Sequence, residues 1–193
     1  TCTTKPEGLI QLPADEAAHD SDVEWWYWTG HFQDEGGHWY GFEHVFFLSS
    51  YNDAPAMMSH HAITDVDHAN FVYDIQTRFE GPVAVENGFE FALGPHSAVG
   101  GGGDDHLHTE VDNYILDVQL TDVKGPVFQH EDGYHAYDFG GDTFYYSRPR
   151  MELQGTLQRD GETLAVTGES WFDHQWGALN AAADVGWDWF ALQ

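Results

Sequence analysis

The sequence predicts an all-β protein that folds as one antiparallel barrel. Apolar runs recur with short turn signals between them, apolar and polar residues alternate within the runs, and helical periodicity is almost absent. The 193 residues suit one domain, and 41% hydrophobic and 16% aromatic residues suffice for a sizeable core. Closing the sheet into a barrel is the economical arrangement because it removes exposed strand edges.

Four strands are expected in the first half of the chain, at 24–32, 38–48, 57–65 and 70–79. In the first, the odd separation of Trp25 and Trp28 places them on opposite faces. In the last, two sets of residues alternate, Phe71, Tyr73, Ile75 and Phe79 with Val72, Asp74, Gln76 and Arg78. We expect the face with the aromatic residues to be buried and the other to be mostly in water.

The second half continues the strand pattern. Alternation recurs over 89–93 and 116–121. The glycine-rich stretch 100–105 predicts a surface loop, since it is too flexible for a strand and too acidic to cradle phosphate. The clearest hairpin joins 151–158 to 163–171, because Asp160 and Gly161 are the two residues that a type I′ turn favours.

Three segments divide the chain. Residues 1–23 form a polar leader, 24–180 hold the barrel, and 181–193 end in an apolar, strand-like run with no turn signal after it. With no initiator Met and this abrupt end, the chain is expected to be a piece of a longer protein. The single cysteine, Cys2, cannot close an internal disulfide, and an unremarkable terminal Cys is favoured over a lipidated one.

The charge balance restricts the partners. Asp and Glu number 33 against 6 Lys and Arg, for a formal net charge of -27. This charge repels phosphates, so nucleic acid is excluded as a partner. Adaptation to high salt is the favoured explanation, and an acidic secreted protein in ordinary medium is the alternative. No apolar run is long enough to span a membrane, and a secreted, periplasmic or cell-envelope location is favoured.

Tryptophan-rich strings stand on the expected strands and beyond them. They read EWWYWTGH at 24–31, YGF at 40–42, SHHAITD at 59–65, FYYS at 144–147, SWFDHQWG at 170–177 and GWDWF at 186–190. In order and rough spacing they resemble the carotenoid 1,2-hydratase (hydroxyneurosporene synthase) and AttH-like family, from about Glu24 to the end. The resemblance implies a lipocalin-like (calycin-like) barrel that is the first of two in tandem, with a second domain beginning at 181–193.

The resemblance also implies an activity. It points to a cofactor-free lyase or isomerase acting on an apolar isoprenoid or polyene, above all by hydration of a C=C bond, with pericyclic cyclisation as another reaction of related proteins. In that family the proton donor is an aspartate on a Tyr/Trp-x-Asp strand motif, which Asp173 matches. No metal and no other cofactor is expected. The alternative function is a lipocalin-like carrier that binds an apolar small molecule without altering it.

Strand alternation gives this candidate site a geometry. Trp171 and Asp173 share one strand face, where an apolar cavity would raise the pKa of the carboxyl and keep it protonated. Aromatic faces would shelter the cation, and His174 or His60 would hold the attacking water. The candidate catalytic residues are Asp173, Trp171, His174, Tyr145 and Tyr146. The candidate ligand-binding residues are Trp26, Trp28, His60, His61 and Trp176.

Other roles were weighed against these. Asp173 could instead stabilise the end of the barrel by pairing with Arg148 or Arg150, and Glu24 is expected to make structural hydrogen bonds. The ligands of a possible metal site, His106, His108 and Glu110, are expected to be surface residues. The segment 168–172 begins like a serine-nucleophile turn but lacks its closing Gly, so a hydrolase is not expected.

Overall fold

The computed structural model describes residues 10–51, 54–179 and 188–191 and confirms the all-β fold. Helix in these residues is limited to two short 3-10 segments, η1 (Ala14–Glu16) and η2 (Gln129–Glu131). The first strands are β1 (Val23–Asp34), β2 (Trp39–Tyr51), β3 (Ala54–Asp65), β4 (Asn70–Arg78), β5 (Phe89–Leu93) and β6 (His96–Gly101). The others are β7 (Asp104–Val111), β8 (Tyr114–Asp122), β9 (Val127–Phe128), β10 (Tyr134–Ala136), β11 (Gly141–Arg159) and β12 (Glu162–Leu179).

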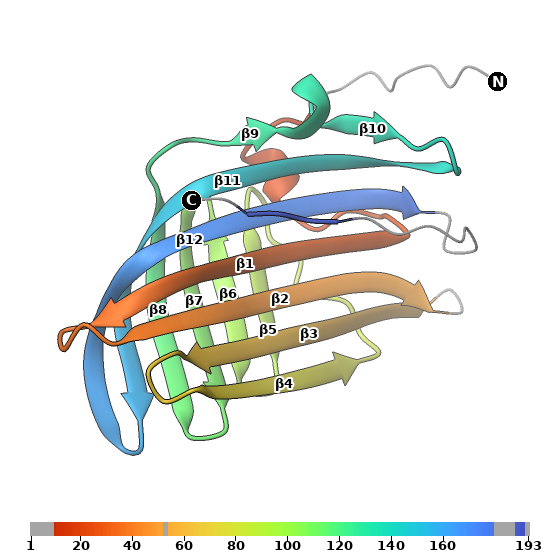
Figure 1. Cartoon of the computed structure of the whole chain (residues 1–193). Helices are drawn as coiled ribbons and strands as arrows, with labels where there is room; N and C mark the ends of the chain where they lie inside the picture. Colours follow the sequence, from red (N-terminus) through yellow and green to blue (C-terminus); the bar gives the residue numbers. More distant parts are fainter. Residues whose placement is uncertain (1–9, 52–53, 180–187, 192–193) are drawn as a thin grey trace.

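The strands form one curled sheet. Its order is β4-β3-β2-β1-β12-β11-β8-β7-β6-β5, and the short strands β9 and β10 pair with β11. Figure 1 shows β1 to β4, β11 and β12 crossing in front of β5 to β8, so that the sheet folds over into a nearly closed barrel. Each strand therefore has an inner face toward the barrel interior and an outer face away from it.

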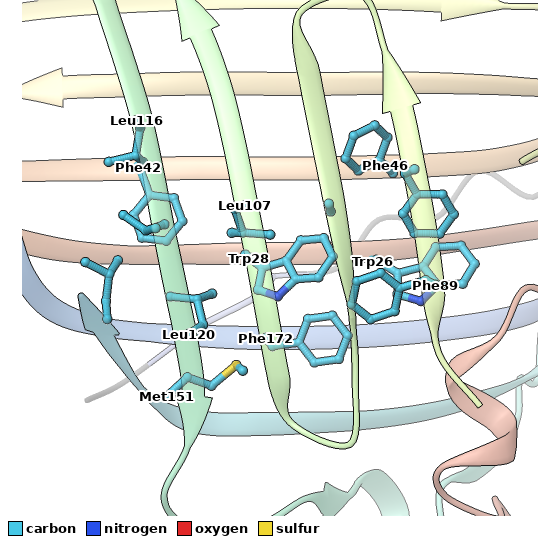
Figure 2. Packing of buried hydrophobic residues seen from close by; sticks show 14 of the residues in the cluster. Trp26, Trp28, Phe42, Phe46, Phe89, Leu107, Leu116, Leu120, Met151 and Phe172 are labelled. Carbon is cyan, nitrogen blue, oxygen red and sulfur yellow. The ribbon is translucent and has the colours of Figure 1, made fainter. Parts of the chain in front are cut away.

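Aromatic side chains fill the barrel interior. Trp26, Trp28, Phe46 and Phe172 are at most 1% exposed. Figure 2 shows these rings packed between the two walls of the barrel, where the ring of Trp28 lies 4.9 Å from that of Phe172. Close packing of this kind resists insertion of other groups, so a ligand inside this part of the barrel would have to displace core rings.

The predicted hairpin is confirmed. β11 and β12 pair up to Arg159 and Glu162, and both residues of the turn between them have positive φ, 52° at Asp160 and 81° at Gly161. Positive φ at both central positions is what a type I′ turn requires. Trp25 and Trp28 lie on opposite faces of β1 as expected, because Trp28 is fully buried inside the barrel and Trp25 lies on the outer face.

The prediction for the faces of β4 was wrong. The face expected to be buried is exposed, with Tyr73 65% and Phe71 60% exposed. Register with β3 turns the other face inward, where Asp74 accepts a hydrogen bond from the buried ring of His96. A period of two residues identifies two faces, but it does not say which one meets the core.

The expected surface loop at 100–105 was also wrong. Gly100 and Gly101 end β6, Asp104 and Asp105 begin β7, and the turn between them lies at Gly102 and Gly103, both with positive φ. The stretch is a tight hairpin because only glycine adopts these backbone angles readily. Asp105 is 2% exposed and points into the barrel.

The ends of the chain bear on the domain prediction. Part of the leader packs on the barrel, since Ile10 belongs to the core and Glu16 is 1% exposed. Residues 188–191 form no strand, and the rest of the apolar run at 187–193 lies outside the described residues. The boundaries at 24 and 181 stay predictions. Across the described segments, no helix has the length and apolar character needed to cross a membrane.

Candidate functional site

The residues of the motif at 170–177 divide between the two faces of β12. Aromatic residues favour the extended backbone here, and pairing with β1 sets Asp173 opposite Tyr27 and His174 opposite Trp26. Trp171, Asp173 and Gln175 therefore lie on the outer face, and Phe172, His174 and Trp176 lie on the inner face. The motif thus builds two separate polar sites.

Asp173 is a buried carboxyl on the outer face, 2% exposed. The hydroxyl of Ser147 donates to its Oδ1 at 2.5 Å, and the indole N–H of Trp189 donates to its Oδ2 at 2.9 Å. Burial raises the pKa of Asp173, and hydrogen bonding from Ser147, Trp171, Trp189 and Tyr145 opposes only part of that rise. The carboxyl therefore holds its proton more strongly than an exposed aspartate.

Aromatic groups surround this carboxyl. Tyr27 lies beside Asp173 on β1, its ring 5.3 Å from that of Trp189, and its hydroxyl donates to Glu43 at 2.7 Å. The indole N–H of Trp171 is buried and interacts with the carboxyl of Asp173, although not with the geometry of a regular hydrogen bond. The site is therefore a carboxyl that holds its proton in an aromatic setting.

A groove of about 530 Å³ opens on the same face, over β1 to β4. Its lining includes the small residues Gly41 and Ala62, the exposed Phe71 and Tyr73 of β4, and the polar side chain of His60. This volume falls within the range of small-molecule sites. The strand pairing places His60 in the same row across the sheet as Asp173, but three strands away. At the usual strand spacing this separation is about 14 Å.

The inner face carries a different polar cluster around Glu24. Its Oε1 lies 2.7 Å from Nε2 of His174 and 2.7 Å from Nδ1 of His19, and it is fully buried. Burial raises the pKa of Glu24, but the hydrogen bonds to the two histidines outweigh it and hold the pKa below its ordinary value. Burial lowers the pKa of His174 and favours its neutral form.

A second inner cluster joins the leader to the barrel. Arg148 forms ion pairs with Glu16 and with Asp122. Nearby, Asp105 accepts a hydrogen bond from the indole N–H of Trp28 at 3.0 Å. Burial raises the pKa of Asp105 to about 7, and the Trp28 hydrogen bond offsets only part of this.

The structure brings together some of the predicted site residues and separates others. The outer face holds Asp173, Trp171, Tyr145 and His60. The inner face holds His174, Tyr146, Trp26, Trp28, His61 and Trp176. His174 and Tyr146 therefore lie across the sheet from Asp173, and His60 lies at a distance from it along the outer face.

The six inner-face residues belong to the packed core. Tyr146 is fully buried, and its hydroxyl lies 3.4 Å from Nδ1 of His174. His61 is also buried, with its Nδ1 2.9 Å from Nδ1 of His44 and its ring stacked on His96 at 3.7 Å. Trp176 stacks on His19 at 4.1 Å.

The alternative roles can be placed as well. Arg148 binds Glu16 and Asp122, and Arg150 binds Glu169, so neither arginine is the partner of Asp173. His106 and His108 both bind Asp117 on the outer surface, where their side chains are 47% and 31% exposed. Ser170 is buried within β12 and donates to the backbone of Thr29.

Sequence reasoning missed the contacts of three polar side chains, of which Asp105 and Arg148 are buried and His19 is 24% exposed. His19 lies in the leader, five residues before Glu24 and 155 before His174, so no short spacing links the cluster. Asp105 follows Asp104 and a run of four glycines, and this stretch resembles a loop. The scarcity of basic residues, 6 against 33 acidic ones, was a usable signal for Arg148, because a buried arginine among so many acids is expected to pair with them.

Comparison with known proteins identifies the family. A family model described as AttH-like matches residues 3–193. The chain belongs to the AttH-like family. The crystal structure of a candidate AttH protein from Nitrosomonas europaea is similar, with 25% identity, a TM-score of 0.79, and coverage of 89% of this chain and 57% of that one. The search of curated proteins gave no match.

A second solved structure shares the fold. Kievitone hydratase from Nectria haematococca superposes with a TM-score of 0.73 at 15% identity, covering 90% of this chain and 53% of that one. This likeness, with that to the Nitrosomonas protein, agrees with a lipocalin-like barrel for this AttH-like chain. The chain spans little more than half the length of either structure.

Proposed function

We propose that the protein is a hydratase that adds water across a C=C bond of an apolar isoprenoid or polyene, as in carotenoid 1,2-hydratase, with Asp173 as the proton donor. The observation that carries the proposal is the buried carboxyl of Asp173, whose pKa is raised by burial among aromatic groups. Protonating an unactivated carbon needs a carboxylic acid that stays neutral, which is what such a setting favours. Membership of the AttH-like family and the likeness to a hydratase fold support it.

The reaction balances with the groups on the outer face. The π electrons of the double bond take the proton of Asp173, which forms a C–H bond and leaves a carboxylate and a tertiary cation. The rings of Trp171 and Trp189 stabilise the cation through their π faces. Water then adds to the cation, and its surplus proton returns to the carboxylate of Asp173.

The hydroxyl of Tyr145 is the group best placed to hold this water. It interacts directly with the carboxyl of Asp173. His174 lies on the other face of the sheet, and His60 lies about 14 Å away along it, so neither reaches the same water. His60 instead lines the groove, together with the exposed side chains of β4.

The groove is the proposed site for the apolar tail of the substrate. It shares the outer face with Asp173, and Phe71, Tyr73 and Ile75 give it an apolar wall. A tail lying across β1, β2 and β3 would bring its terminal double bond to Asp173. A second lipocalin-like domain of the longer protein is proposed to cover this face, in keeping with relatives of which the chain spans 53–57%.

Turnover by the full-length protein tests this function. Wild type and Asp173→Asn are incubated with acyclic carotenoids and shorter isoprenoids, and product and ligand binding are both measured. Hydration by the wild type, with binding retained and turnover lost in the variant, is expected. Equal turnover would remove Asp173 from the reaction. Binding without turnover across the panel would favour the carrier.

A further inference from the structure

Three side chains of metal-binding type converge on the inner face of the barrel. His19 precedes β1, Glu24 lies in β1 and His174 lies in β12, and one ligand atom of each falls within 4.8 Å of the others. Nδ1 of His19 and Nε2 of His174 both lie 2.7 Å from Oε1 of Glu24. Elements distant in sequence thus present two imidazole nitrogens and a carboxylate oxygen to one point.

We propose that His19, Glu24 and His174 bind a divalent transition metal ion, with zinc as the best match. Two imidazoles and one carboxylate are a set of ligands that zinc takes in proteins, with bonds of about 2.0–2.2 Å. Around a tetrahedral ion such ligand atoms lie about 3.3 Å apart. The two short contacts to Glu24 would therefore lengthen by about 0.6 Å on binding.

Groups outside the three ligands are already placed to orient them. The backbone N–H of His19 donates to Oε2 of Glu24 at 2.8 Å, which leaves Oε1 for the metal. Nδ1 of His174 faces the hydroxyl of Tyr146 at 3.4 Å, and Nε2 of His19 lies 3.7 Å from a carboxylate oxygen of Asp15. Metal-binding histidines usually donate their second ring N–H to such groups, which fixes the tautomer.

Aromatic walls hold the two imidazole rings. Trp176 stacks on His19 at 4.1 Å with an interplanar angle of 3°, and Trp26 stacks on His174 at 4.4 Å. Glu24 and His174 are fully buried, whereas the side chain of His19 is 24% exposed. The site is therefore rigid on its inner side and open to solvent beside His19, where a water can complete the coordination.

The proposed site lies where the leader meets the barrel, since His19 precedes β1 while Glu24 and His174 lie in β1 and β12. The ion would fasten the leader to β1 and β12. It lies on the opposite face of the sheet from Asp173, so the proposal does not depend on the hydratase reaction.

Zinc titration of the metal-free chain tests the proposal. We expect a single tight site by calorimetry and a rise in Tm of about 5–10 °C at zinc concentrations about 100-fold above Kd. Both measurements are made in 0.5 M NaCl to screen weak binding by the acidic surface. Cobalt(II) in place of zinc should give the intense visible bands of a tetrahedral site.

Two variants distinguish this site from other histidines. His19→Ala should lose the tight site and the rise in Tm. His106→Ala is the matched control, because it also removes a histidine paired with a carboxylate, and it should keep both. Circular dichroism checks that each variant is folded, and His19→Gln replaces His19→Ala if the latter is not. No zinc-dependent rise in the wild type, or an equal rise in His19→Ala or His19→Gln, would overturn the proposal.

Discussion

Asp173 and His174 are neighbours in the sequence, yet their side chains lie on opposite faces of β12. Asp173 meets Ser147 and Trp189 on the outer face, and His174 meets Glu24 inside the barrel. One change at each position should therefore separate a chemical role from a structural one.

His174→Leu should destabilise the fold by about 2–4 kcal/mol, because Glu24 then stays buried with one fewer hydrogen-bond donor. Asp173→Asn should cost less, about 1 kcal/mol, because burial already disfavours the charged form and the amide oxygen still accepts one of the two hydrogen bonds from Ser147 and Trp189. Urea unfolding of both variants measures the difference. Equal losses would show that Asp173 is as structural as His174.

Asp105 should make stability depend on pH. Its pKa is raised to about 7 in the fold, so between pH 4 and 7 the unfolded chain releases a proton that the folded chain keeps. The contribution of Asp105 to the free energy of unfolding is complete at low pH. It is lost as the pH rises through that window, by about 1.4 kcal/mol per pH unit. Asp105→Asn should remove this component from urea unfolding measured across the range.

Asp104→Asn, at the exposed neighbouring position, is the matched control for Asp105. It should keep the pH slope of the wild type. If Asp105→Asn keeps that slope as well, Asp105 does not hold its proton in the fold.

Gly30 and Gly41 lie on paired strands but differ in the space around them. A methyl group at Gly30 would lie 2.2 Å from the backbone oxygen of Glu169, whereas at Gly41 the nearest atom is 3.7 Å away. Gly30→Ala should therefore destabilise by about 1–3 kcal/mol or more, and Gly41→Ala by less than about 1 kcal/mol. Thermal unfolding of the two variants measures this difference. A Gly30→Ala variant as stable as the wild type would contradict this packing of β1 on β12.

The exposed face of β4 should bind apolar dyes and promote association of the isolated chain. Tyr73→Thr and Ile75→Thr, at positions 65% and 50% exposed, should weaken both effects and change stability by about 0.5 kcal/mol or less. Dye fluorescence and sedimentation at several concentrations measure this. Unchanged dye binding in the double variant would place the apolar surface elsewhere.

Much of the fold could be predicted from local signals. The Asp160–Gly161 hairpin, the opposite faces of Trp25 and Trp28 and the near absence of helix all follow from turn chemistry and side-chain alternation. The faces of β4 could not be predicted, because the inward position of Asp74 depends on a hydrogen bond to His96, 22 residues away.

The candidate site was only partly predictable for the same reason. Alternation correctly put Trp171 and Asp173 on one face of β12. It could not show that β11 turns Tyr145 to that face and Tyr146 to the core, since the register between strands sets this. The cluster at Glu24 could not be predicted, because His19 of the leader and His174 of β12 are far apart in the sequence and meet only in the folded protein.

Hydration in D₂O by the full-length protein tests the central role of Asp173 most directly. Proton transfer from Asp173 to carbon predicts one deuterium bound to the carbon next to the new C–OH in the wild-type product. Asp173→Asn should slow its appearance by about 10²-fold to 10⁴-fold while still binding the substrate. Deuterium incorporation at the wild-type rate in Asp173→Asn would contradict the role of this carboxyl.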